Sequence, residues 1–219
     1  MGAEVTFAIV DPEQGREAYQ WHRGFAATDE HIFPRPWELY QRLAYDGCVM
    51  CARDAQSDYL GLAYFSREEG SPATWEIGGL MVSIKTRGSG IGTVLGFLTL
   101  AHVLFEEDPL SRGESVIAHV HAENDKPRKL LSDRMRFAFS RRLKIPGAAL
   151  PGLKPNAEGF VEGDELKLTR PDALLALAEW CESWTSTLLE GRRAEIGLRE
   201  GTSLTMWAQA FRQMAGLAP

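Results

Sequence analysis

The chain has 219 residues, of which 44% are hydrophobic and 25% charged, and its formal net charge is −6. These values are ordinary for a soluble globular protein that buries a sizeable core. The acidic balance argues against general nucleic-acid binding, which favours basic patches, and is compatible with a cationic amine as substrate.

Targeting and redox signals are weak. The first residues contain no basic segment followed by an apolar run, so we expect no signal peptide. No apolar run approaches the roughly 20 residues that span a bilayer. Cys48 and Cys51 form a C-x-x-C pattern, but residues three apart on a strand point to opposite faces, and three cysteines are too few for a disulfide framework. We therefore expect buried thiols and a cytoplasmic protein.

Hydrophobic periodicity and turn residues predict a βααβββαβαβ order, which is an α/β (α+β) pattern. In chain order, the predicted elements are strand 4–10, helix 11–26, helix 36–47, strands 48–54, 58–66 and 74–84, helix 91–105, strand 114–122, helix 124–139 and strand 165–169. Residues 140–163 are rich in Pro and Gly and carry no clear pattern.

Two further helices are predicted after this core, over residues 172–190 and 203–215. We therefore divide the chain into a domain of residues 1–170 and a C-terminal helical extension of residues 171–219. The apolar stripes of the extension predict packing on the core. A homodimer interface or a lid over a binding site are the alternatives.

Residues 74–105 are the centre of the pattern. A β-branched strand, interrupted by Gly78 and Gly79, is followed by a glycine-rich turn and a helix that is apolar on almost every face. Paired glycines within a strand are typical of a bulge or of close approach by a ligand. The turn at Arg87–Gly92 leads into a helix N-terminus, where free N–H groups and the helix dipole favour an anion such as a phosphate. A tight turn that only serves packing remains the alternative.

The same stretch resembles the acetyl-CoA motif of the GNAT superfamily of N-acetyltransferases. The family pattern Arg/Gln-x-x-Gly-x-Gly/Ala is met by Arg87, Gly90 and Gly92, and the family's Asn after the next strand is matched by Asn124. The resemblance covers residues 74–131 closely and 5–73 less closely. It implies a mixed, mostly antiparallel sheet flanked by helices.

The resemblance also implies acetyl-CoA as acyl donor, with no metal. Backbone groups of the central strand would bind the pantetheine arm, and the turn would bind the pyrophosphate. The donor-binding residues implied are Leu80, Met81, Val82, Arg87, Gly88, Ser89, Gly90, Ile91, Gly92, Thr93 and Asn124.

Acetyl transfer to an amine requires a base, because an alkylamine with a pKa near 10.4 is protonated at neutral pH. Glu76 is the predicted base, at the place on the strand where some family members carry a catalytic Glu, and a solvent-facing charge is its alternative role. The family often uses a Tyr as the acid that protonates the thiolate, but the matching position is Leu131. Ser132 could substitute for that Tyr or hold a water.

His119, His121 and Glu123 alternate along one strand and therefore share a face. This pattern could hold a metal, or His121 could serve as a second base. In this family the loop between the first two helices borders the acceptor site. The resemblance therefore implies Asp29, Glu30, His31 and Trp37 as substrate-binding residues.

The sequence thus predicts a cytoplasmic N-acetyltransferase that moves an acetyl group directly from acetyl-CoA to a primary amine. A small-molecule acceptor is favoured over a protein, with no membrane and no general nucleic-acid partner. The alternative is a non-catalytic CoA-binding or regulatory module of the same fold, which the missing Tyr favours.

Overall fold

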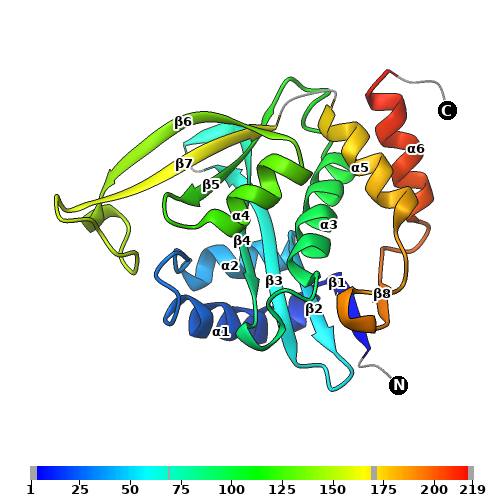
Figure 1. The fold of residues 1–219 in the computed structure, drawn as a ribbon, viewed down its shortest axis with the longest axis horizontal. Coiled ribbons are helices and arrows are strands. Elements are labelled where there is room, and N and C mark those ends of the chain that lie inside the picture. Colours follow the sequence, from blue (N-terminus) through cyan, green and yellow to red (C-terminus); the bar gives the residue numbers. More distant parts are fainter. Residues whose placement is uncertain (1–3, 69, 169–171, 217–219) are drawn as a thin grey trace.

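The computed structural model describes residues 4–68, 70–168 and 172–216, and it places their strands in one eight-stranded sheet (Figure 1). The strand order is β6-β7-β5-β4-β3-β2-β1-β8. The strands are β1 Val5–Ile9, β2 Val49–Asp54, β3 Tyr59–Glu68, β4 Ser71–Val82, β5 Ser115–His121, β6 Phe137–Pro146, β7 Phe160–Leu168 and β8 Ala194–Ile196. Among the strand pairs of the described residues, β4–β5 and β1–β8 are parallel and the others antiparallel, so the predicted mixed, mostly antiparallel sheet is confirmed.

Helices cover both faces of this sheet. They are α1 Gly15–Ala26, α2 Trp37–Tyr45, α3 Ile91–Glu106, α4 Asp125–Lys129, α5 Asp172–Ser183 and α6 Leu204–Met214. Short 3-10 helices lie at Pro12–Gln14, Ile84–Thr86, Gly147–Ala149 and Leu189–Gly191, and a π-helical turn at Leu130–Arg134.

Two neighbouring residues of β3 show which helices share a face. The ring of Tyr64 lies 6.5 Å from the rings of both His22 in α1 and Tyr40 in α2. The ring of Phe65 lies 5.4 Å from the ring of His102 in α3. Since successive side chains of a strand point to opposite faces, α1 and α2 cover one face and α3 covers the other.

The helix α3 is buried on nearly every side, as its apolar sequence predicts. It begins directly after Gly90, whose φ of 93° is left-handed and suits glycine. Its outer side is covered by the C-terminal helices. Trp207 of α6 lies 5.9 Å from Phe105, and Trp180 of α5 stacks on Phe97 at 5.1 Å.

The C-terminal segment also supplies β8, which pairs in parallel with β1. The sequence analysis does not predict this three-residue strand, because a run of three residues is too short to show the alternation of apolar and polar residues that indicates a strand. The predicted boundary at residues 170 and 171 lies outside the described residues.

Two predicted helices end earlier than expected. The helix predicted over 124–139 leaves the helical conformation after Arg134, and Phe137–Pro146 is strand β6 instead. Arg136, directly before the strand, has a φ of 61°, a left-handed conformation that cannot continue a helix. The helix predicted over 172–190 ends at Ser183, where the chain turns back toward β8.

In the part of the chain that the structure describes, the helices are all too short or too polar to cross a membrane.

Two histidines are buried in the helix layers, and they make stability depend on pH. Burial lowers the pKa of His22 and of His102 from 6.5 to about 4. The unfolded chain therefore binds more protons than the folded one between pH 6.5 and 4, so the free energy of unfolding falls as the pH falls through this range. Between pH 7 and pH 5 each histidine lowers it by about 2 kcal/mol.

We predict that His22→Phe removes one such contribution. Both ring nitrogens of His22 are buried without a hydrogen-bond partner among the described residues, so a Phe ring fits the site without losing a bond. Urea unfolding at pH 7 and pH 5 measures the effect. The variant should lose about 2 kcal/mol less than the wild type between the two pH values, and an equal loss in both proteins would contradict the assignment.

Candidate active site

The parallel strands β4 and β5 are paired only at their beginnings. Pairing covers Thr74–Glu76 of β4 and Ser115–Ile117 of β5. Beyond these residues both strands continue, to Val82 and His121, without pairing to each other. An opening through the sheet therefore lies between them, bordered by backbone groups that have no partner strand on that side.

A bulge lies in β4 beside this opening. Tyr64 of β3 pairs with Gly78, but Leu62 pairs with Met81, so β4 has one residue more than β3 over this stretch. Gly79 has a φ of 59°, and a Cβ there would lie 2.2 Å from the Tyr64 ring. Glycine is thus required at this position, and the bulge stands where the paired glycines predict it.

The glycine turn follows the end of β4. Gly88 and Gly90 both have left-handed φ values, 91° and 93°, and the second is the N-cap of α3. The Ser89 side chain points inward and donates to the carbonyl oxygen of Thr86 at 2.7 Å. Beside the turn, a guanidinium nitrogen of Arg87 lies 3.0 Å from a carboxylate oxygen of Asp29. Gly90, Gly92 and Thr93 line the adjoining cavity, so the N-terminus of α3, with its free N–H groups, lies beside that cavity.

Two cavities meet at the opening between the strands. The first, of about 550 Å³, contains Tyr64, Glu76 and His119 and extends to Gly96 of α3, and we call it the acceptor cavity after the role that the resemblance implies. The second, of about 840 Å³, adjoins the glycine turn and we call it the donor cavity. The residues that line both are His31, Ile32, Leu80, Asn124 and Pro127.

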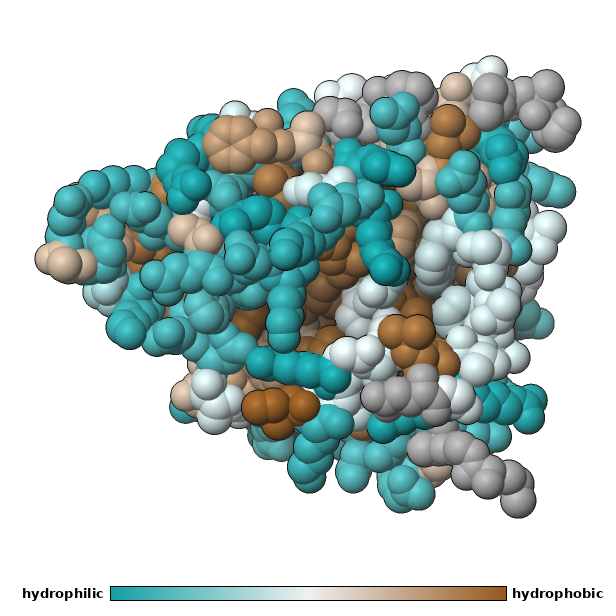
Figure 2. Space-filling view, in the orientation of Figure 1, coloured by the Kyte–Doolittle hydropathy of each residue, from teal (hydrophilic) through white to brown (hydrophobic). Residues whose placement is uncertain are grey.

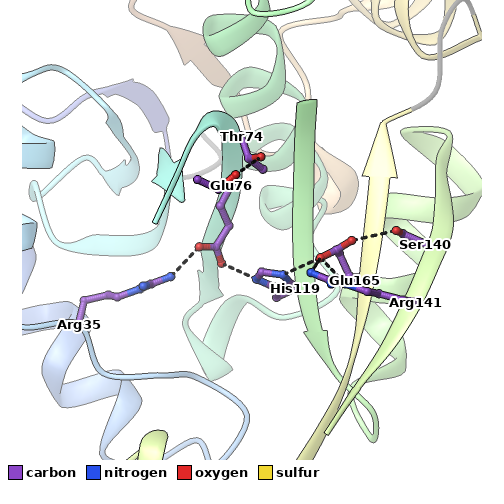
Figure 3. Close-up of polar contacts among 8 residues, drawn as sticks. Arg35, Thr74, Glu76, His119, Ser140, Arg141 and Glu165 are labelled. Carbon is purple, nitrogen blue, oxygen red and sulfur yellow. Dashed lines mark hydrogen bonds and ion pairs between the residues drawn. The ribbon is translucent and has the colours of Figure 1, made fainter. Parts of the chain in front are cut away.

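A row of charged side chains begins in the acceptor cavity and continues beyond it to β6 (Figure 3). Glu76 accepts a hydrogen bond from Arg35 at 2.9 Å and lies 3.4 Å from Nδ1 of His119. The other ring nitrogen of His119 lies 3.6 Å from Glu165, which is held by Arg141 at 2.6 Å. Strand register explains the row, because these four strand residues fall on the same face of β4, β5, β7 and β6.

Electrostatics keep Glu76 ionised. Burial tends to raise the pKa of its carboxyl, but the hydrogen bond with His119 and the positive charge of Arg35 outweigh burial and hold that pKa below its usual value. Burial tends to lower the pKa of His119, and its contacts with Glu76 outweigh it, so the pKa of His119 is raised. The row therefore contains an ionised carboxylate beside an imidazole whose protonated form it stabilises.

His121 forms a second group at the junction of the two cavities. Its ring lies 4.9 Å from that of His31, and burial, with the nearby His31, lowers the pKa of His121. His31, His121 and Glu123 bring three potential metal-ligand atoms within 4.8 Å of one another. The alternating pattern of the sequence included His119 in this cluster, but that residue belongs to the row around Glu76 instead.

The donor-binding residues implied by the sequence divide into two kinds. Those that line the donor cavity are Leu80, Val82, Arg87, Gly88, Gly90, Gly92, Thr93 and Asn124. The side chains of Met81, Ser89 and Ile91 are buried in the core, so only their backbone groups could face a ligand.

Among the other predicted residues, Glu76, His31 and His121 line the acceptor cavity. Asp29 lines the donor cavity and not the acceptor cavity, since Arg87 holds it beside the turn. Three residues line neither cavity. Ser132 lies on the π-helical turn, Glu30 lies 3.7 Å from Lys154, and Trp37 packs on Tyr19 at 5.2 Å.

Sequence reasoning missed several residues of the cavities and of the charged row. Arg35 lies in an irregular loop. Glu165, which contacts His119 but lines neither cavity, lies in a strand of which only the end carries a pattern. Tyr64 reads as a core aromatic, yet its hydroxyl accepts a hydrogen bond from Arg35 at 2.7 Å and its ring supports the bulge. The residues of the C-terminal segment that line the donor cavity are Trp180, Ser183, Trp184, Thr185, Thr187, Leu188 and Leu189.

Comparison with solved structures gives the fold. The chain is similar to a chain of the NatC complex bound to Gag peptide and CoA, at 15% identity and a TM-score of 0.57, over 77% of this chain and 99% of that one. It is similar to the diaminobutyrate acetyltransferase EctA from Paenibacillus lautus, at 16% identity and a TM-score of 0.53, over 75% and 95%. It is also similar to an acetyltransferase of the GNAT family from Streptococcus pneumoniae, at 9% and 0.55, over 75% and 98%. No protein-family model and no curated protein matches the sequence.

We predict that Gly79→Ala is more destabilising than Gly70→Ala. Both glycines have left-handed φ values, 59° and 79°, so each alanine costs about 1–2 kcal/mol in backbone strain. Only at Gly79 does the added methyl overlap the Tyr64 ring, which adds about 1–3 kcal/mol. Urea unfolding of the two variants measures the difference, and equal losses of stability would show that the ring is not fixed against the bulge.

Proposed function

Since this chain has the fold of the GNAT acetyltransferases, we propose that it transfers an acetyl group from acetyl-CoA to a primary amine. One observation carries the proposal. The opening between β4 and β5 joins a cavity at the glycine turn to a cavity that contains a buried carboxylate. A donor and an acceptor that enter from opposite faces of the sheet would meet in this opening.

The donor cavity supports this assignment through its anion-binding features. The left-handed glycines let a pyrophosphate approach the backbone, and the N-terminus of α3 adds N–H groups and about half a positive charge. Arg87 lies beside the turn. From there the pantetheine arm would follow the unpaired edge of β4, where Leu80 at the bulge lines both cavities.

The acceptor amine needs to lose its proton before it attacks the thioester. We propose that the Glu76–His119 pair accepts this proton, either directly or through a water. Glu76 is ionised at neutral pH, so its carboxylate can accept the proton, and its 3.4 Å contact with His119 holds the imidazole beside it. The amine nitrogen then attacks the thioester carbon, and the bond from that carbon to sulfur breaks to release the CoA thiolate.

The positions of the cysteines support direct transfer of the acetyl group, with no acyl-enzyme intermediate. Cys48, Cys51 and Cys181 are buried, free and absent from the lining of both cavities. Burial raises the pKa of Cys48 and of Cys181 to about 12, so neither forms a thiolate at neutral pH. Free thiols are also in keeping with a reducing compartment, and we place the protein in the cytoplasm.

The acceptor we propose is a small amine with an apolar body. Next to the charged row, the acceptor cavity is lined by the apolar residues Leu143, Ile145, Leu150, Leu153 and Val161. The connection between β6 and β7 reaches the loop before α2. A Cβ on Gly152 would lie 2.8 Å from Pro34, and Lys154 lies 3.7 Å from Glu30. These contacts close the cavity on the side of the β6–β7 connection, which favours a compact molecule over a polypeptide.

The second candidate is a CoA-binding module without catalysis. It is favoured by Leu131, a buried residue that lines the acceptor cavity where the family often has a Tyr acid. A thiol with a pKa near 8.5 leaves without an acid, however, so this residue does not by itself prevent transfer.

Donor binding is tested by thermal unfolding with and without acetyl-CoA. At 100 times its dissociation constant the ligand stabilises the fold by about 2.7 kcal/mol, which raises the Tm of a chain of this size by about 5–10 °C. Gly90→Ala should abolish the shift, because it alters the N-cap at the anion site. Gly113→Ala is the matched control, since its φ of 72° carries the same strain and it lines neither cavity. Absence of a shift in the wild type at millimolar donor would refute the donor site.

Catalysis is tested by Glu76→Gln, scored against a panel of small amines. We expect kcat/KM to fall by about 10²–10⁴-fold while acetyl-CoA affinity is kept, because the amide cannot accept a proton. Glu162→Gln is the control, as this carboxylate lines the same cavity but does not contact His119. Unchanged turnover in Glu76→Gln would exclude Glu76 as the base. Tight acetyl-CoA binding without turnover of any amine would favour the non-catalytic module.

A further inference from the structure

The C-terminal segment lies against the glycine turn. The side-chain atom nearest to a Cβ placed on Gly90 is a Leu189 carbon, at 3.7 Å. Leu189 is 64% exposed, which is unusual for a large apolar side chain beside a cavity of this size. With six other residues of 180–189 it forms one wall of the donor cavity, which we call the C-terminal wall.

Several contacts fix this wall to the core. The Trp180 ring stacks on Phe97 of α3 at an angle of 3°, and Trp184 lies edge-on to Phe7 of β1 at 6.5 Å. The backbone N–H of Leu188 donates to the carbonyl of Arg192 at 2.8 Å. Just beyond, β8 joins the main sheet. The wall is therefore a built part of the cavity.

The chemistry of the wall differs from that of the rest of the cavity. The lining residues of 180–189 are two tryptophans, two leucines and three hydroxyl residues, and none is charged. The opposite side, from α4 and the π-helical turn, is charged, and contributes the cations Lys126 and Arg134 and the carboxylate of Asp125. Figure 2 shows the same division, with a hollow lined by apolar atoms between a hydrophilic surface and a pale strip of intermediate hydropathy.

The order of sites along the cavity indicates what the wall would contact. The thioester end of the donor must reach the acceptor cavity, and the residues shared by the two cavities mark that end. The turn, with its anion site, lies beside the wall, because Leu189 is the nearest residue to a Cβ placed on Gly90. None of the C-terminal wall lines the acceptor cavity, so the wall is beyond the thioester end.

We propose that the C-terminal wall binds the adenosine of the donor, with the adenine against Trp184 and Leu189. This inference rests on the proposed function, and it adds residues 180–189 to the donor site. A neutral aromatic base and ribose hydroxyls match an uncharged wall of tryptophan, leucine, serine and threonine. The phosphates match the turn and the cations on the other side.

The test is isothermal calorimetry with three probes: CoA, adenosine 3′,5′-bisphosphate and S-acetylpantetheine, which lacks the nucleotide. The variant is Leu189→Asp, which puts a negative charge next to the turn. Met206→Asp is the control. It makes the same kind of change at a partly exposed apolar residue of the extension that lines neither cavity, and an acidic residue in the first turn of α6 suits the helix dipole.

We expect Leu189→Asp to lower the affinity for CoA and for the bisphosphate by at least tenfold. The affinity for S-acetylpantetheine should change by less than twofold. Met206→Asp should bind all three probes with wild-type affinity. Wild-type affinity for CoA in Leu189→Asp would overturn the inference and leave the proposed function standing. Equal losses for CoA and S-acetylpantetheine would overturn the assignment to adenosine. A wild type that binds none of the three probes would overturn the proposed function and this inference together.

Discussion

The parallel pairing of β4 and β5, and its end at Glu76 and Ile117, is the constraint on which the rest of the structure depends. Where the pairing ends, the cavity beside the glycine turn meets the cavity that contains Glu76. Because the strands diverge, backbone groups of β4 face an open space. The bulge at Gly79 then turns Leu80 toward the place where the cavities meet.

Two strands that diverge within a sheet must be stabilised by contacts with the layers on either face. The helix α3 provides these contacts on one face, since its apolar residues pack beneath β2, β3 and β4. On the other face the row from Arg35 to Arg141 links the loop before α2 with β4, β5, β7 and β6 (Figure 3). Burying so many charges is costly unless each is paired, and here each carboxylate has a basic partner on both sides. The same pairing lowers the pKa of Glu76 and raises the pKa of His119.

The C-terminal segment contributes to both the core and the donor cavity. It covers α3 through Trp180 and Trp207, contributes β8 to the sheet edge and lines the donor cavity at the glycine turn. One segment thus completes the core and one of the cavities. The two roles are compatible because α3 runs from the turn into the core, so a segment that packs along it also reaches its N-terminus.

The sequence by itself determined the local features. The apolar run of α3, the glycine turn before it and the strand with paired glycines are contiguous, so propensity and periodicity locate them and the resemblance to the GNAT pattern follows. Only the tertiary structure decided which distant groups meet. Arg35 contacts Glu76 from 41 positions away, and Leu189 reaches Gly90 from the far end of the chain. Strand β6 and the short β8 likewise form because partner strands stabilise them, and a local pattern does not encode a partner.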